Sequence, residues 1–301
     1  MNQVALRLLL LLYPRAWRAR YGQELRYVIV RSTAAGRSPW RVGADVARAA
    51  AVVRSQALGI VGAGVTRHDR ATGGCVLALW AWVAIAIAGA GLQKASEHWQ
   101  GAVPTGERGL ATVAFTTVIA AAVCGAVIVL AGVAVTMPRV VTMLVGGGWS
   151  DIRGPVRRAV GVTVIAAAWT LGLAIWAHRL GPVQRNGGDP LYGAVVLGWG
   201  LCVAVTLAAW TAVASLLARQ IGLGRRLLVT ETVLAAAATG AMAVMSVATL
   251  VWWRSVGSEA PGFFGGGSVT TPVTAAVILM AVSTVLGAAG TARAARALDL
   301  I

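Results

Sequence analysis

One acidic residue, Glu231, lies inside a long apolar stretch and is the strongest candidate for chemistry in this chain. Ionisable side chains within a membrane are costly and often functional, for example as proton or cation sites. Glu231 comes four positions after Leu227, where its apolar stretch begins, so a helix would place it only about 6 Å deep. Arg219, Arg225 and Arg226 could reach it from the interface. The sequence therefore favours an interfacial ion pair at Glu231, with a functional intramembrane acid as the alternative.

The residue types that usually bind metals or attack substrates are scattered along the chain. It contains three histidines and three cysteines, none in an HExxH or CxxC pattern: His68, His98, His178, Cys75, Cys124 and Cys202. The glycine-rich runs at 146–148 and 265–267 lack the Lys-Ser/Thr pair of a phosphate-binding loop. We therefore predict no catalytic residue, no cofactor and no metal site, and expect that the chain is not an enzyme.

Six long apolar stretches must position these residues. They cover residues 75–92, 110–135, 159–177, 191–217, 227–253 and 272–292. A helix needs about 20 apolar residues to cross ~30 Å of hydrocarbon, and in lipid only helices and closed barrels satisfy their backbone hydrogen bonds. With 12% charged residues and a mean hydropathy of +0.76, the chain has too few charges for a soluble protein of 301 residues. We predict an all-α fold, a six-span transmembrane helical bundle over residues 74–301.

Basic residues are distributed unequally between the two sides of these spans. If residues 1–74 are cytoplasmic, the inner segments hold 21 of the 26 Lys and Arg residues and the outer segments hold 5. This split follows the positive-inside rule and predicts that both the N- and C-termini are cytoplasmic. Every basic residue except Lys94 is Arg, a bias that suggests the GC-rich codons of an actinobacterial type of bacterium. The expected location is a bacterial plasma membrane.

Tryptophans lie near several predicted span ends. Trp99, Trp176, Trp252 and Trp253 fall at the outer ends, and Trp149 falls in the first inner loop. The indole ring favours the headgroup level of a bilayer because its body is apolar and its N–H needs a partner. These residues are therefore predicted to form aromatic belts.

Residues 1–73 differ from the remainder and are predicted to be a cytoplasmic or interfacial helical segment. The pattern predicts a short helix at Leu8–Leu12, a second from Pro14 to about Thr33, and a third from Pro39 to about Leu58. The second and third helices are amphipathic and basic. We favour a small bundle that rests on the anionic inner leaflet of the lipid bilayer. The alternative is a docking surface for a cytoplasmic regulator or another membrane subunit, and nucleic acid is not expected as a partner.

The segment Tyr13–Leu25 reads YPRAWRARYGQEL. It resembles the YPRxxRxRYGxEL opening of a set of uncharacterised actinobacterial multi-pass integral membrane proteins, often encoded beside PadR-type transcriptional regulators. It is also similar to the cytoplasmic prefix of some ABC-type export permeases. The resemblance implies a helical docking module, with these residues as candidates for contact with a partner or lipid: Arg15, Trp17, Arg18, Arg20, Tyr21 and Glu24.

The resemblance covers about the first thirty residues, and the chain departs from the permeases beyond them. Its predicted outer loops are each under twenty residues, too short for the large extracytoplasmic domain of those permeases. We therefore expect an integral membrane protein with a non-enzymatic signalling, regulatory or accessory role. The alternative is a small transporter or a component of an export system, for which Glu231 and the threonine-rich spans are the support.

Overall fold

The computed structural model describes residues 3–57, 66–96, 99–181, 190–264 and 270–300. Every regular element in these ranges is helical. Six of the helices in the described ranges are long and apolar enough to cross a membrane, which confirms the predicted helical class and the predicted number of candidate spans. They are α4 (Arg67–Ala95), α6 (Gly109–Met143), α7 (Trp149–Arg179), α8 (Pro190–Gln220), α9 (Arg225–Glu259) and α10 (Thr270–Ala297).

The long helices continue past the apolar stretches at one end of the bundle. α4 begins at Arg67 rather than at Cys75, and α6 and α7 are joined only by the π-helical turn Leu144–Gly148. Gly147 reverses the chain there with φ of +93°, a conformation that favours glycine. Hydropathy places span ends where charge begins, whereas the helices extend into the charged region because their arginines can reach water from a helical backbone.

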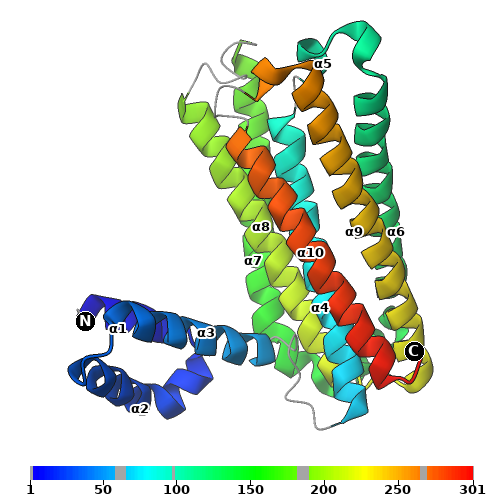
Figure 1. Cartoon of the computed structure of the whole chain (residues 1–301). Coiled ribbons are helices and arrows are strands. Elements are labelled where there is room, and N and C mark those ends of the chain that lie inside the picture. Colours follow the sequence, from blue (N-terminus) through cyan, green and yellow to red (C-terminus); the bar gives the residue numbers. More distant parts are fainter. Residues whose placement is uncertain (1–2, 58–65, 97–98, 182–189, 265–269, 301) are drawn as a thin grey trace.

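Pairs of antiparallel helices build the bundle (Figure 1). The most extensive contacts join α4 to α10 and α6 to α9, and α7 packs on α8. α4 also contacts α8 and α9, so it lies at the centre of the arrangement. Among the described residues, α4 contacts α6 at few positions. Both helices contribute to the walls of the two cavities described below.

An aromatic cluster fills the bundle at the end where α4 finishes. Trp252 is fully buried and its ring meets those of Trp99, Phe115 and Phe264 with centroids 5.9–6.3 Å apart. Trp99 is itself only 2% exposed. The prediction that Trp99 and Trp252 belong to an interfacial belt is therefore wrong, because both indoles pack against other aromatic rings inside the protein.

The N-terminal residues form a separate three-helix unit of α1 (Gln3–Leu11), α2 (Arg15–Ala34) and α3 (Pro39–Ala57). Its core consists of Leu6, Tyr13, Ile29, Val42, Val46 and Ala50. The Tyr13 hydroxyl donates to the Val46 carbonyl at 3.2 Å, and Arg54 donates to the carbonyls of Leu11 and Leu12. These bonds tie the end of α1 to α3, so the unit has its own core and its own polar contacts.

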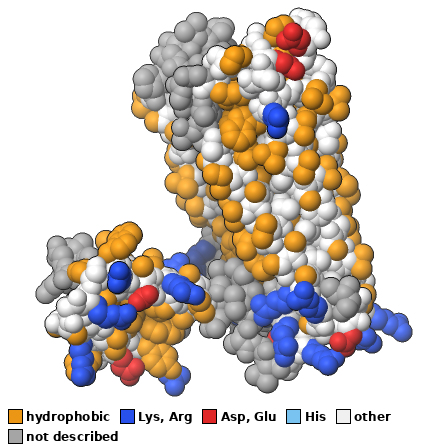
Figure 2. All heavy atoms as spheres, in the orientation of Figure 1, with side chains coloured by type: hydrophobic (Ala, Val, Ile, Leu, Met, Phe, Trp, Pro, Cys, Tyr) orange, Lys and Arg blue, Asp and Glu red, His pale blue; other side chains and the backbone are white. Residues whose placement is uncertain are grey.

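Exposed arginines gather at the end of the bundle where α4 begins and α10 ends (Figure 2). We call this the arginine-rich end; its exposed members are Arg67, Arg70, Arg139, Arg153, Arg157, Arg158, Arg219, Arg225, Arg226 and Arg296. One of them, Arg67, forms an ion pair of 2.6 Å with Asp299 that ties the start of α4 to the residues after α10. In Figure 1 the unit α1–α3 lies to one side of this end.

Candidate functional site

Glu231 lines a cavity of about 150 Å³ near the arginine-rich end of the bundle. We call it the Glu231 cavity. Its walls come from α4, α6, α8 and α9, together with Leu223 from the turn between α8 and α9. Glu231 lies six residues after the first residue of α9, which corresponds to about 9 Å along the helix axis. The carboxylate therefore enters the bundle just inside the arginine-rich end.

The carboxylate of Glu231 faces α6 where that helix carries a glycine. A Cβ built on Gly132 would lie 3.1 Å from Oε2 and 3.6 Å from Oε1 of Glu231, so only a residue without a side chain leaves ordinary room there. The Oε1 atom is buried and has no hydrogen-bond partner in the described residues. An unpaired buried acceptor typically costs about 1–3 kcal/mol, so a donor from outside the chain, whether water or a ligand, would stabilise this oxygen.

Glu231 makes no ion pair within 4.0 Å in the part of the chain that the structure describes. The structure therefore does not form, among the described residues, the predicted interfacial pair with Arg219, Arg225 or Arg226. All three arginines are exposed, whereas Glu231 points between the helices. The depth of Glu231 was predictable from its place in the sequence, but the direction of its side chain depends on how α9 is rotated against α6.

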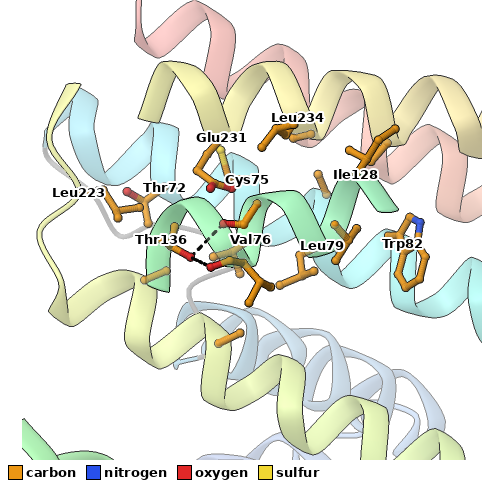
Figure 3. Close-up of a pocket in the computed structure, with 18 residues that line it drawn as sticks. Thr72, Cys75, Val76, Leu79, Trp82, Ile128, Thr136, Leu223, Glu231 and Leu234 are labelled. Carbon is orange, nitrogen blue, oxygen red and sulfur yellow. Dashed lines mark hydrogen bonds between the residues drawn. The ribbon is translucent and has the colours of Figure 1, made fainter. Parts of the chain in front are cut away.

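A second unpaired polar atom lines the same cavity. Thr72 of α4 is 7% exposed, and its Oγ1 has no hydrogen-bond partner among the described residues. Figure 3 shows Thr72 and Glu231 toward one end of the cavity and Trp82 at the other. Cys75 and Thr232 are hydrogen-bonded to each other, with 3.6 Å between Cys75 Sγ and Thr232 Oγ1. The cavity thus combines, among the described residues, one unpaired carboxylate oxygen and one unpaired hydroxyl at one end with an aromatic ring at the other.

Trp82 separates the Glu231 cavity from a second cavity in the other half of the bundle. The second cavity has a volume of about 280 Å³ and lies between α4 and α6, with Trp82, Phe115 and Met245 among its lining residues. The indole of Trp82 reaches Gly125 of α6, where an added Cβ would lie 2.7 Å from Nε1. The indole of Trp82 therefore fills the space between α4 and α6 beside Gly125, which has no side chain.

The candidate docking residues of α2 separate into an inner and an outer group. Trp17 is half-buried and stacks on Tyr13 with ring centroids 4.1 Å apart, so it supports the core of the three-helix unit. Arg20, Tyr21 and Glu24 are exposed, and the guanidinium of Arg20 lies 5.3 Å from the Tyr21 ring centroid. The accessible part of the candidate set is therefore Arg20, Tyr21 and Glu24.

Two arginines of the motif remain. Arg18 is half-buried, and its Nε atom is buried without a hydrogen-bond partner in the described residues. The side chain of Arg15 lies outside the residues that the structure describes. The structure therefore places Arg18 on the border between the core and the surface of the unit and leaves Arg15 as a sequence-based candidate.

No group of three or more His, Cys, Asp or Glu side chains in the described ranges could hold a metal ion. The three cysteines are free thiols. The Nδ1 atom of His178 lies 2.8 Å from the Ala174 carbonyl of its own helix, and His98 lies outside the described residues. Among the described residues, these side chains therefore assemble no group of metal ligands beside the Glu231 cavity.

The sequence identified Glu231 as a candidate but did not identify the residues that surround its carboxylate in the cavity. Gly132, Thr72 and Trp82 come from α6 and α4, far from Glu231 in the chain. Glycine, threonine and tryptophan are ordinary components of membrane helices, so no local pattern marks them. Only the packing of the helices brings them to one cavity.

No family model, no curated protein and no solved structure matches this chain. The functional interpretation therefore follows from its own residues and geometry.

Proposed function

We propose that this chain is a bacterial plasma-membrane protein with a non-enzymatic signalling, regulatory or accessory role. In this proposal the arginine-rich end faces the cytoplasm, and the three-helix unit α1–α3 is its docking module. The observation that carries the proposal is that this unit has a core of its own while most of its arginines remain on the surface. Such a preformed basic surface would bind a partner without the loss of entropy that ordering a disordered segment requires.

The surface of the unit combines positive charge with aromatic rings. Its exposed arginines include Arg20, Arg26, Arg31, Arg41 and Arg48. The described acidic residues of the unit are Glu24 and Asp45, and Asp45 is already paired with Arg37 at 3.6 Å. Tyr27 and Trp40 are 64% and 83% exposed. Arginine and exposed aromatic residues are enriched at binding interfaces, and a net positive surface suits an acidic regulator or anionic lipid headgroups.

The distribution of arginines on the bundle supports this role. The arginine-rich end carries exposed arginines from all of the long helices (Figure 2), and the positive-inside rule places such an end in the cytoplasm. Because α4 begins at this end, the unit before it would lie on the cytoplasmic side. There it could meet soluble regulators and the inner leaflet together.

The test uses full-length protein in a strain from which the gene is deleted. Arg20 and Arg31 are both exposed on α2, and the variant R20E/R31E reverses two charges without touching the core of the unit. The matched control R157E/R158E reverses two exposed charges of α7 at the same end of the bundle. We expect deletion to change the transcription profile, and the wild type and R157E/R158E to restore it at equal membrane levels. R20E/R31E should not restore it.

Two outcomes would contradict the proposal. One is a deletion strain with unchanged transcription, and the other is full restoration by R20E/R31E. Co-purification of a soluble regulator with the wild type and its loss with R20E/R31E would then identify the partner.

The Glu231 cavity supports a second candidate, a small transporter or a component of an export system. An intramembrane carboxylate without a partner is a feature that transport proteins use to bind charged substrates. If E231Q leaves every transport and resistance phenotype of the strain unchanged, this candidate loses its main support.

A further inference from the structure

We propose that the Glu231 cavity is a binding site for a small organic ammonium ion, a protonated amine attached to a compact apolar body. This inference concerns binding within the membrane bundle and does not depend on the docking role of α1–α3. Four features of the cavity carry it: an unpaired carboxylate oxygen, an unpaired hydroxyl, apolar walls, and a volume suited to one ring.

The carboxylate determines the charge of the ligand. Glu231 has no ion pair among the described residues, and its Oε1 atom is buried without a hydrogen-bond partner. A carboxylate in a membrane bundle is stabilised by an opposite charge and by donors to its oxygens. A ligand that supplies both in one group is a cation with N–H bonds.

The hydroxyl oxygen of Thr72 can accept a hydrogen bond from a second N–H group of the ligand. Its Oγ1 atom is buried and has no hydrogen-bond partner in the part of the chain that the structure describes, and it lines the same end of the cavity as Glu231 (Figure 3). An ammonium group has several N–H donors and no acceptor, so it can donate to both oxygens. A divalent metal fits less well, because Mg²⁺ and Ca²⁺ need about six or more oxygen ligands, and the cavity offers one carboxylate.

The walls determine the remainder of the ligand. Beyond Glu231 and Thr72 the cavity is lined mainly by apolar side chains, including Val76, Leu79, Ile128 and Leu234. Burial of apolar surface contributes about 25 cal/mol per Å², so an apolar body adds affinity that a hydrated inorganic cation cannot provide. An amine on a hydrocarbon body therefore matches the cavity better than a sodium or potassium ion.

The volume limits the size of that body. The cavity measures about 150 Å³, and an apolar cavity of about that size is known to hold a single benzene molecule. Trp82 lies at the end away from Glu231 (Figure 3), so an aromatic ring between them would contact the indole while its ammonium group meets the carboxylate. The ligand class is thus a monoamine with one ring or a short alkyl chain.

Binding is tested with benzylammonium as the probe, by isothermal titration calorimetry on the full chain in detergent micelles. Heats from empty micelles are subtracted, and benzyl alcohol serves as the neutral probe of the same shape. We expect saturable binding of benzylammonium, at least tenfold weaker binding of benzyl alcohol, and at least tenfold weaker binding of benzylammonium by E231Q. Glu259 lies at the other end of α9, and E259Q should bind as the wild type does.

A second pair of variants tests the location independently of charge. Ala235 lines the cavity one turn after Glu231, whereas Ala236 is exposed and is not among the lining residues. We expect A235L to lower the affinity for benzylammonium at least tenfold, because the larger side chain fills the cavity, and A236L to leave it unchanged.

Several results would overturn the proposal. They are equal affinities for benzylammonium and benzyl alcohol, equal affinities of the wild type and E231Q, and equal affinities of A235L and A236L. Absence of saturable binding by monodisperse, helical wild-type protein would overturn it as well. All four outcomes are independent of the transcription test, so the failure of one proposal leaves the other standing.

Discussion

The backbones of Gly74 in α4 and Gly290 in α10 lie directly against each other. A Cβ built on Gly290 would lie 2.7 Å from the Gly74 carbonyl oxygen and 3.1 Å from the Ala78 nitrogen, closer than ordinary Cβ contacts allow. Lipid tails are as apolar as the helices, so spans associate largely through close packing, and small residues permit it. This crossing explains why α4 and α10 form the most extensive contact in the bundle.

The variant G290A tests this crossing. The added methyl group must separate two backbones, and overpacking of this kind costs about 1–3 kcal/mol. We expect a lower midpoint of thermal unfolding in detergent. G240A is the matched control on α9, where nothing lies within 4 Å of an added Cβ. It should be neutral or slightly stabilising, because alanine favours helix. Equal destabilisation by both variants would contradict the packing argument.

A hydrogen bond between Trp80 and Ser215 connects α4 to α8. The indole Nε1 donates to Ser215 Oγ at 3.2 Å, and Ser215 is fully buried. S215A would leave the indole N–H unpaired, and we expect a loss of about 0.5–1.5 kcal/mol in unfolding free energy, in the range measured for bonds between membrane helices. T116A is the control, since Thr116 is exposed and bonds to the Thr112 carbonyl of its own helix. A larger loss in T116A than in S215A would contradict the assignment.

The buried hydroxyl of Tyr13 stabilises the three-helix unit. Y13F would remove the hydrogen bond of 3.2 Å from the Tyr13 hydroxyl to the Val46 carbonyl, a loss of about 1 kcal/mol. We expect subtilisin to cleave full-length Y13F within residues 1–57 about fivefold faster than the wild type, because cleavage requires local unfolding. Tyr27 is 64% exposed, so Y27F should leave the rate unchanged. If Y27F accelerates cleavage as much as Y13F does, the hydrogen bond is not the cause.

The same residue makes the stability of the unit depend on pH. Burial raises the pKa of Tyr13 above its usual value of 10.0. Above pH 10 an unfolded Tyr13 would lose its proton while the folded one retains it, so stability falls as pH rises from the unfolded pKa to the folded pKa. Cleavage of the wild type should accelerate as the pH rises through and above 10, and Y13F should show a smaller acceleration. An identical pH dependence in the two proteins would exclude Tyr13 as its source.

The unpaired carboxylate should lower the stability of the bundle. Glu231 Oε1 is buried and has no partner within the described ranges, and replacement by an apolar side chain removes the cost of an unpaired buried acceptor. We expect E231L to raise the midpoint of thermal unfolding, corresponding to about 1–2 kcal/mol, as is common where a functional site trades stability for binding. E107L, at an exposed glutamate, should have little effect. A lower midpoint for E231L would show that the carboxylate has stabilising contacts.

The sequence predicted the elements of the fold better than their contacts. Six apolar stretches sufficed to predict six helices that are long and apolar enough to cross a membrane, because hydrocarbon thickness sets the minimum length of such a helix. The start of the second helix after Pro14 followed from local backbone restrictions, and the helix breaks at Gly36 and Gly147 have the same kind of local cause, with φ of +82° and +93°. These features depend on neighbouring residues alone, so they could be read along the chain.

The candidate site was predictable only in part, because a site depends on how helices are rotated against each other. Glu231 stood out as the acidic residue within an apolar stretch, but its partners could not be inferred from distance along the chain. Trp252 shows the same limit: its position suits a membrane interface, whereas packing against Trp99 and Phe115 buries it completely. Hydropathy describes depth in the membrane and carries little information on which neighbour a side chain faces.

The proposed function depends on six spans with both ends of the chain in the cytoplasm. Single cysteines in a chain without its native Cys75, Cys124 and Cys202 can be labelled by a membrane-impermeant maleimide in intact cells. The positions are exposed and lie at both ends of the bundle and in the N-terminal unit: Ala44, Gly106, Gln220, Gly262 and Leu300.

We expect G106C and G262C to react in intact cells, and A44C, Q220C and L300C to react only after the membrane is permeabilised. Labelling of A44C and L300C from opposite sides would contradict the account, because an even number of spans places both on one face. Labelling of both from outside would reverse the orientation and remove the docking module from the cytoplasm.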